Sequence, residues 1–195
     1  MNERIEQVVS DKRRKEIIDG KIYMMATPSD KHIRIQLNLC YIFNNYFNQS
    51  KRRCTAVFAK DLYINDKNWL VPDTLVYCKS NNEKKKKNIP LIVVEVLSDS
   101  TWKKDITVKM KKYAELEIEQ YWIIDPDTQR LTIYKLENGK YEEPGALYNL
   151  PVENSYSPLL EDEEDAVIKE FSPDFFPELT IHLEDIFNFE NLDIL

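Results

Sequence analysis

The pattern of apolar and polar positions predicts that strands and helices alternate along this chain. Apolar residues flank Asp19-Gly20, and such a pair favours a tight two-residue turn, so residues 16–25 are expected to form a β-hairpin. Residues 29–48 are expected to form a helix that Ser29 or Asp30 caps. The residues predicted to form its apolar face, spaced about 3.6 positions apart, are Ile33, Leu37, Cys40 or Tyr41, and Asn44 or Tyr46.

The middle of the chain is expected to supply the main strands. Residues 54–64 alternate and are rich in β-forming side chains, and a polar turn leads from them into a second strand over 69–78. Residues 91–97 are almost continuously apolar, as is typical of a strand covered on both faces. This segment is predicted to be the central strand, and Glu95 is its single charge.

A β-α-β unit is predicted after the central strand. A helix over 102–115 is followed by a buried strand over 121–124. Because such crossovers are right-handed, the helix is expected beside the Glu95 strand. An antiparallel pair, 131–136 with 140–142, is expected to extend the sheet.

Length and composition predict one domain over residues 1–195. The chain is 43% hydrophobic, which is enough to bury a core. Residues 14–143 are expected to hold the functional core. Residues 144–195 are expected to form an acidic loop and a C-terminal strand and turn. The predicted fold class is α/β (α+β), a mixed sheet flanked by helices with an antiparallel β extension.

Cysteine usage and hydropathy predict a cytoplasmic protein. The N-terminal stretch is charged, and no apolar run reaches the roughly 18 residues of a membrane span. Cys40, Cys54 and Cys78 are an odd number of cysteines without C-x-x-C spacing. This pattern argues against a disulfide framework and against a zinc site, so all three are expected to be reduced and two or three to be buried.

Charge is distributed unevenly along the chain. Residues 1–115 contain 23 Lys+Arg and 14 Asp+Glu, a net charge of +9, whereas residues 116–195 contain 4 and 20, a net charge of −16. A polyanionic substrate could therefore meet a locally basic cleft on a protein whose total charge is −7. The alternative is that these basic residues form ordinary solvated surfaces. Lys84–Lys87 in particular are expected in a solvated loop or at a DNA backbone.

Two carboxylates and one amine are the candidate chemistry. Asp73 precedes a predicted strand, Glu95 lies in the central strand, and Lys109 lies on the following helix. Mg²⁺ prefers oxygen ligands and is often held by one or two carboxylates, and a nearby amine can assist the attacking water. The alternative is that Glu95 is a buried acid paired with a lysine for structure, since an unpaired buried acid is costly.

The combined pattern resembles the Uma-two family of putative restriction endonucleases. The matching segments are Glu16-x-x-Asp19-Gly20-x-x-Tyr23-x-Met25, Pro28-x-x-x-His32, Pro72-Asp73, Val94-Glu95-Val96-Leu97-Ser98-x-Ser100-Thr101, Asp105-x-x-x-Lys109-x-x-x-Tyr113 and Glu119-x-Tyr121-Trp122-x-x-Asp125-Pro126. The resemblance covers roughly residues 14–143. The family is similar to the PD-(D/E)XK nuclease superfamily, which implies Mg²⁺-dependent or Mn²⁺-dependent cleavage of DNA.

The resemblance implies a role for each matching residue. Asp73 and Glu95, with the adjacent Val96, would hold the metal. The family's in-line lysine is replaced by Leu97, and Lys109 on the next helix would take over its role. The residues expected in supporting roles are Glu16 as an auxiliary metal or water ligand, His32 near a phosphate or Glu16 unless it only caps or packs, and Tyr113 as a packing residue with its hydroxyl near the site. Around Glu117-Ile118 the chain departs from the family, which usually has a glycine there.

Two further expectations remain open at the level of the sequence. A homodimer is predicted, because double-strand scission needs two active sites and because the tail is rich in phenylalanine at positions 175, 176, 187 and 189. The same phenylalanines could instead fold back onto the sheet. A non-catalytic nucleic-acid-binding or assembly module that retains the fold is the alternative function, because Leu97 occupies the lysine position and the protein is acidic overall.

Overall fold

The structure is a computed structural model that describes the chain except residues 1–13, 80–88, 99–104, 143–145, 150–168 and 191–195. It divides into two compact units. The smaller unit combines Met1–Thr27 with Asp61–Val71, and the larger combines Pro28–Lys60 with Pro72–Leu195. The prediction of one domain over 1–195 stays a prediction.

The smaller unit is built around the predicted hairpin. Its sheet has the strand order β2-β1-β5-β4, with β1 at Lys15–Ile18, β2 at Lys21–Met24, β4 at Leu62–Asn65 and β5 at Asn68–Leu70. Asp19 and Gly20 have φ angles of 50° and 76°, the left-handed conformation that a two-residue primed turn requires. The hairpin over 16–25 is therefore confirmed.

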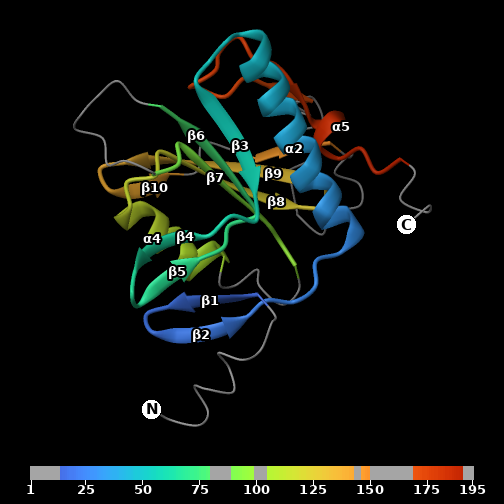
Figure 1. Cartoon of the computed structure of the whole chain (residues 1–195). Helices are drawn as coiled ribbons and strands as arrows, with labels where there is room; N and C mark the ends of the chain where they lie inside the picture. The colour runs from blue at the N-terminus through green and yellow to red at the C-terminus, as the bar shows by residue number, and fades with distance from the viewer. Residues whose placement is uncertain (1–13, 80–88, 99–104, 143–145, 150–168, 191–195) are drawn as a thin grey trace, which may run out of the picture. The chain divides into compact units, whose positions relative to one another are not determined.

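The larger unit contains the mixed sheet that the sequence predicts. Its strand order is β10-β9-β8-β7-β6-β3, and β11 pairs with β9 (Figure 1). The strands are β3 (Cys54–Phe58), β6 (Thr74–Cys78), β7 (Ile92–Val96), β8 (Gln120–Asp125), β9 (Arg130–Glu137), β10 (Lys140–Glu142) and β11 (Ala146–Tyr148). The β7–β8 pairing is parallel and the neighbouring pairings are antiparallel, so the mixed sheet, the β-α-β unit and the antiparallel extension are all confirmed.

Two predicted strands are each divided in the structure. The segment 54–64 separates into β3 and β4, and 69–78 separates into β5 and β6. Ala59 has a φ of 48°, which extended backbone does not permit. Pro72 has no N–H to donate to a ladder. The prediction of two continuous strands was wrong, because alternation of side chains does not reveal these backbone breaks.

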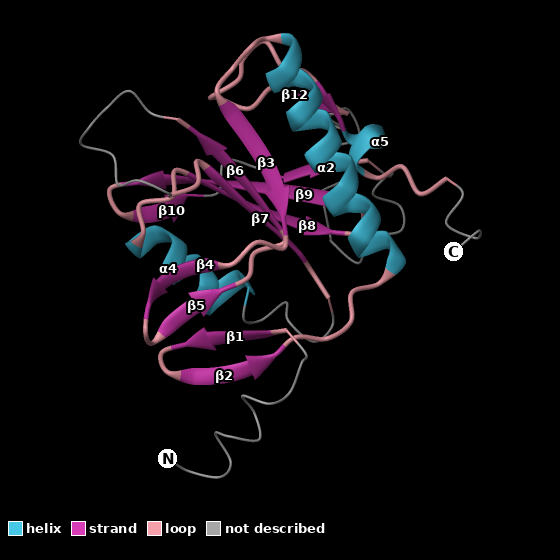
Figure 2. Cartoon of the chain, viewed as in Figure 1, coloured by secondary structure: helices cyan, strands magenta, loops and turns pink. Residues whose placement is uncertain are grey.

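Helices α2 and α4 flank the segments that carry the candidate site residues (Figure 2). Helix α2 spans Asp30–Gln49, and the side chain of Ser29 caps it by accepting a hydrogen bond from the His32 N–H. After β7 in the sequence, a π-helical turn, η1 (Asp105–Lys109), leads into α4 (Met110–Glu115). None of the helices in the described ranges is long and apolar enough to cross a membrane.

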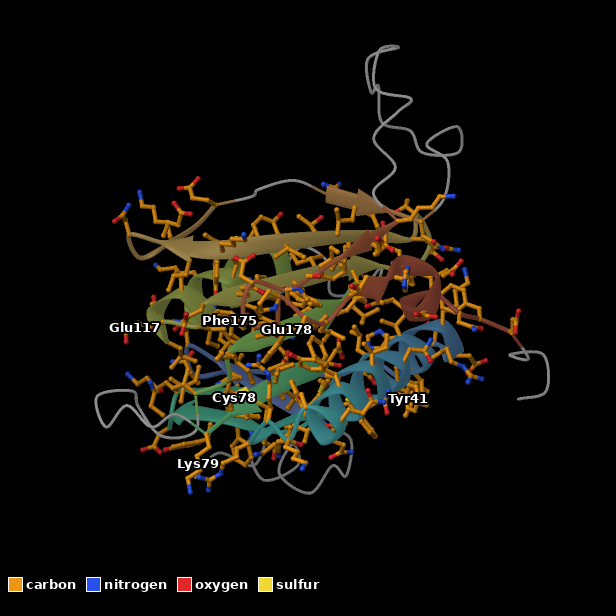
Figure 3. All side chains as sticks on the ribbon, turned by 90° about the horizontal axis from the view of Figure 1, so that it is seen from above. Tyr41, Cys78, Lys79, Glu117, Phe175 and Glu178 are labelled. Carbon is orange, nitrogen blue, oxygen red and sulfur yellow. A yellow bond between two sulfur atoms is a disulfide. The ribbon has the colours of Figure 1, made fainter. Side chains whose placement is uncertain are left out.

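The face of α2 that packs on the sheet differs from the predicted one. The buried residues are His32, Ile35, Gln36, Leu39, Cys40, Phe43 and Phe47. Leu37 is 44% exposed and Tyr41 is 72% exposed. Figure 3 shows Tyr41 on the outer side of the helix. The helical periodicity was predicted correctly, but the wrong face of the helix was predicted to be buried, because α2 has apolar residues on two faces.

Asn44 of α2 binds the edge strand β3. Its side chain hydrogen-bonds both the N–H and the carbonyl of Ala56.

The end of α4 keeps the geometry that a glycine would provide. Glu117 has a φ of 61° and its N–H donates to the Ala114 carbonyl, while the Ile118 N–H donates to the Tyr113 carbonyl. These two bonds form a Schellman motif, in which glycine is the usual residue at the left-handed position. The departure from the family pattern at Glu117 therefore leaves the helix end intact.

The C-terminal segment supplies core side chains to the larger unit. It contains β12 (Glu170–Phe171), β13 (Ile181–His182) and α5 (Leu183–Ile186). Phe176 and Phe187 are buried in the main core, and Phe175 and Phe189 pack against it. The phenylalanines therefore fold back onto the core, and they give no support to the predicted homodimer.

The expectation of three reduced cysteines was wrong. Cys54 and Cys78 form a disulfide between directly paired residues of β3 and β6, with their Cα atoms 4.0 Å apart. The two positions are 24 residues apart, so only the strand register brings them together. Cys40 is free and buried as expected, and burial raises its pKa to about 11. Its thiol therefore stays protonated at neutral pH.

Removal of the disulfide is expected to destabilise the larger unit. Closing a loop of this length restricts the unfolded chain and is worth about 3 kcal/mol. Cys54→Ser/Cys78→Ser should lower the free energy of unfolding in urea by about that amount, and dithiothreitol should affect the wild type but not the double variant. Equal stability of the oxidised wild type and the double variant would contradict this pairing.

Two expected features lie outside the described residues. They are the Lys84–Lys87 loop and most of the acidic segment between 144 and 165.

Candidate active site

Asp73 directly precedes β6, and Glu95 is the penultimate residue of β7. The antiparallel register pairs Thr74 with Val94, so continuing it by one residue places Asp73 across from Glu95. The Val96 N–H donates a 2.7 Å hydrogen bond to Asp73 Oδ2, which ties Asp73 to the end of β7. The sequence prediction that Asp73 and Glu95 are brought together is consistent with this register.

Glu95 accepts hydrogen bonds from two side chains of the following helix. Lys109 Nζ lies 2.9 Å from Glu95 Oε1, and the Tyr113 hydroxyl donates to the same oxygen at 2.5 Å. The side chains of Lys109 and Glu95 are only 4% and 2% exposed, so this is a buried ion pair. A buried charge needs such partners, because water no longer solvates it.

The alternation of β7 explains why Glu95 meets this helix. Val94 and Val96 join the core cluster that includes Ile35 and Leu39 of α2. Successive side chains of a strand point to opposite faces, so Glu95 points away from that cluster. Lys109 and Tyr113 are one helical turn apart and share one face of the helix. The predicted proximity of both residues to Glu95 is confirmed.

Asp73 is held by the first two turns of α2. His32 Nε2 lies 2.9 Å from Asp73 Oδ1, and Gln36 Nε2 donates to the same oxygen at 2.8 Å. All three residues are buried. His32 therefore contacts Asp73. The sequence analysis had predicted a different partner for His32, either a phosphate or Glu16.

Gln36 is the site residue that sequence reasoning missed. It lies one helical turn after His32 and on the same face. The remaining buried residues of α2 are Ile35, Leu39, Cys40, Phe43 and Phe47, which are apolar residues and one cysteine. A glutamine on an apolar face, four residues after a histidine, is the signal that could have identified it. That signal was hidden because the wrong face of α2 was predicted to be buried.

Glu16 belongs to the smaller unit and has a partner there. Its Oε1 accepts a 3.0 Å hydrogen bond from the Val71 N–H, and its side chain is buried. This bond joins β1 to the segment that follows β5. The role of Glu16 as an auxiliary ligand stays a prediction.

The donor set suits a hard divalent ion. Among the residues that the structure describes, no group of three or more His, Cys, Asp or Glu side chains is arranged to hold a metal. Mg²⁺ needs fewer, because it keeps several waters and is usually bound by one or two carboxylates. Asp73 and Glu95 provide two. Asp73 Oδ2 accepts one hydrogen bond within the described chain and retains a second lone pair for a ligand.

A family model described as putative restriction endonuclease, Uma2, matches residues 2–163. The chain belongs to the Uma2 family. This membership confirms the resemblance inferred from the motifs around Asp73, Glu95 and Lys109. The description of the family supports a nuclease.

Two relatives extend the comparison. An uncharacterized protein of Synechocystis sp. is 30% identical over 122 residues, which span 61% of this chain and 64% of that protein. A solved structure described as a putative nuclease belonging to DUF820 from Anabaena variabilis superposes with a TM-score of 0.66 at 20% identity. That match covers 95% of this chain and 96% of the other. At this identity the likeness establishes the fold.

Proposed function

We propose that this protein is a Mg²⁺-dependent endonuclease that hydrolyses DNA phosphodiester bonds, with Mn²⁺ as an alternative metal. The observation that carries the proposal is the buried Lys109–Glu95 pair across from Asp73, in a member of a restriction-endonuclease-like family. Two acids, one where β6 begins and one near the end of β7, with an amine beside the second, are groups that hydrolysis of a phosphodiester can use.

Asp73 and Glu95 would hold the metal, and the neighbouring Val96 would be a further ligand position. When bound, Mg²⁺ would supply positive charge for the phosphate and lower the pKa of a coordinated water. Carboxylates are suitable ligands because Mg²⁺ prefers oxygen.

Lys109 and Tyr113 would prepare the site for the reaction. The Lys109 ammonium lies at Glu95 Oε1, where it can donate to a phosphate oxygen or orient the attacking water. The Tyr113 hydroxyl donates to the same oxygen and keeps Glu95 in one orientation. Lys109 thus takes the place of the in-line lysine that is absent at Leu97.

DNA is the proposed substrate because of the family and the charge distribution. Residues 1–115, which contain the candidate site, carry a net charge of +9, and cationic side chains bind the phosphate backbone. The target can be duplex, branched or damaged DNA. A homodimer would supply two active sites for cleavage of both strands.

Metal-dependent nicking of supercoiled plasmid tests this proposal. The wild type should convert the plasmid to open circles in Mg²⁺ or Mn²⁺ and should be inactive in EDTA. No cleavage with any divalent ion, by protein whose circular dichroism is that of a folded chain, would refute the proposed activity.

The second candidate is a non-catalytic nucleic-acid-binding or assembly module. Two observations favour it: Leu97 replaces the in-line lysine, and Asp73 already accepts hydrogen bonds from three donors. This function predicts DNA binding that persists in EDTA and weakens steeply with salt, without cleavage. A metal-dependent nicked product would exclude it.

A further inference from the structure

The two carboxylate oxygens of Asp73 have different hydrogen-bond partners. Asp73 Oδ1 accepts hydrogen bonds from Gln36 Nε2 at 2.8 Å and from His32 Nε2 at 2.9 Å. A carboxylate oxygen has two lone pairs, so these two donors occupy both of them. Asp73 Oδ2 accepts one bond, from the Val96 N–H at 2.7 Å, among the residues that the structure describes.

The donors can be assigned from the acceptor they share. Because Asp73 Oδ1 is a carboxylate oxygen, the Gln36 atom that faces it must be the amide nitrogen, and His32 must carry a hydrogen on Nε2. The 3.3 Å separation between Gln36 Nε2 and His32 Nε2 is then a contact between two donors that converge on one oxygen. As whole residues, Gln36, His32 and Asp73 are 6%, 9% and 8% exposed, so water competes little for these bonds.

We propose that Gln36 is a positioning residue of the metal site. It holds Asp73 Oδ1 so that only Oδ2 is directed to the metal, and Asp73 therefore binds through one oxygen. The inference rests on the proposed metal-dependent function, and it adds a residue outside the metal ligands and the proton-transferring groups. Outer-shell partners of this kind orient a ligand and typically change metal affinity by about 10-fold to 100-fold when they are lost.

The helix fixes Gln36 independently of the metal. Ile35 and Leu39 of α2 are fully buried in the core, so the helix cannot rotate to move Gln36 away from Asp73. Preorganisation of this kind orients a ligand before the metal arrives, which lowers the cost of binding.

Gln36→Met tests the proposal, because methionine is similar in length and removes the amide. Mn²⁺ affinity, measured by isothermal titration without DNA, should fall by about 10-fold or more. In the nicking assay the Mg²⁺ concentration for half-maximal cleavage should rise by a similar factor, and saturating Mg²⁺ should restore most of the rate. A merely structural residue would instead lower the rate at every metal concentration.

Gln49→Met is the matched control, since Gln49 lies on the same helix and its side chain is exposed and bonds only Asn45 among the described residues. It should bind metal as the wild type does. Gln36→Glu provides a second variant if Gln36→Met does not fold, because it places an acceptor against Asp73 and should weaken metal binding at least as much. Wild-type Mn²⁺ affinity in a folded Gln36 variant would overturn this inference while leaving the proposed function intact. A wild type that neither binds metal nor cleaves would refute the proposed function itself.

Discussion

Asp73→Ala is expected to reduce magnesium-dependent nicking to the level seen in EDTA. The variant removes a proposed metal ligand and the acceptor that ties the start of β6 to the end of β7 and to α2. The circular dichroism spectrum should remain that of the wild type. The measurement is the rate of plasmid nicking over a range of Mg²⁺ concentrations.

Loss of this carboxylate also has a cost in stability. It leaves buried donors on His32, Gln36 and Val96 without an acceptor, and each such donor costs about 1–3 kcal/mol. Assays therefore belong well below the melting temperature of the variant. Asp73→Asn keeps one oxygen for His32 and Gln36 and should be more stable but equally inactive. Asp127→Ala, in an exposed turn, is the control. An Asp73→Ala protein that nicks at the wild-type rate would remove Asp73 from the site.

Lys109→Met should slow cleavage on the order of 10²-fold to 10⁴-fold, as is typical of a lost acid-base group. DNA binding should barely change, because the Lys109 side chain is buried against Glu95 rather than exposed to a phosphate backbone. Cleavage rates and salt-dependent affinities measured on the variant decide whether Lys109 acts in the chemical step. Lys111→Met is the control, since Lys111 is exposed on the same helix and should lose at most one phosphate contact.

A double variant separates chemistry from folding at this pair. Lys109→Met leaves Glu95 as a buried charge with one cationic partner fewer, and breaking a buried pair in this way costs about 3–5 kcal/mol. Glu95→Gln/Lys109→Met removes both charges and should recover much of the lost stability. If the double variant regains the stability of the wild type but does not cleave DNA, the pair has a role in the reaction. If Lys109→Met is destabilised by this amount and yet cleaves as fast as the wild type, the pair is structural.

The sequence by itself determined the elements whose conformation depends on neighbouring residues in the chain. Asp19-Gly20 specifies its turn because the two left-handed residues it needs are present in the turn itself. The continuous apolar run around Glu95 specifies a buried strand, and the single acid within it requires a partner. Lys109 and Tyr113, one turn apart on the following helix, then become that partner through the right-handed crossover, which is nearly invariant.

Only the tertiary structure decided the features that depend on phase and register. Helix α2 carries apolar residues on both faces, so its periodicity cannot identify the buried side, and Gln36 stayed hidden with it. The strand register brings Cys54 to Cys78 and Asp73 to the Val96 N–H, and no local pattern encodes a pairing between strands so far apart in sequence. Local sequence sets which elements form, whereas long-range packing sets which of their side chains meet.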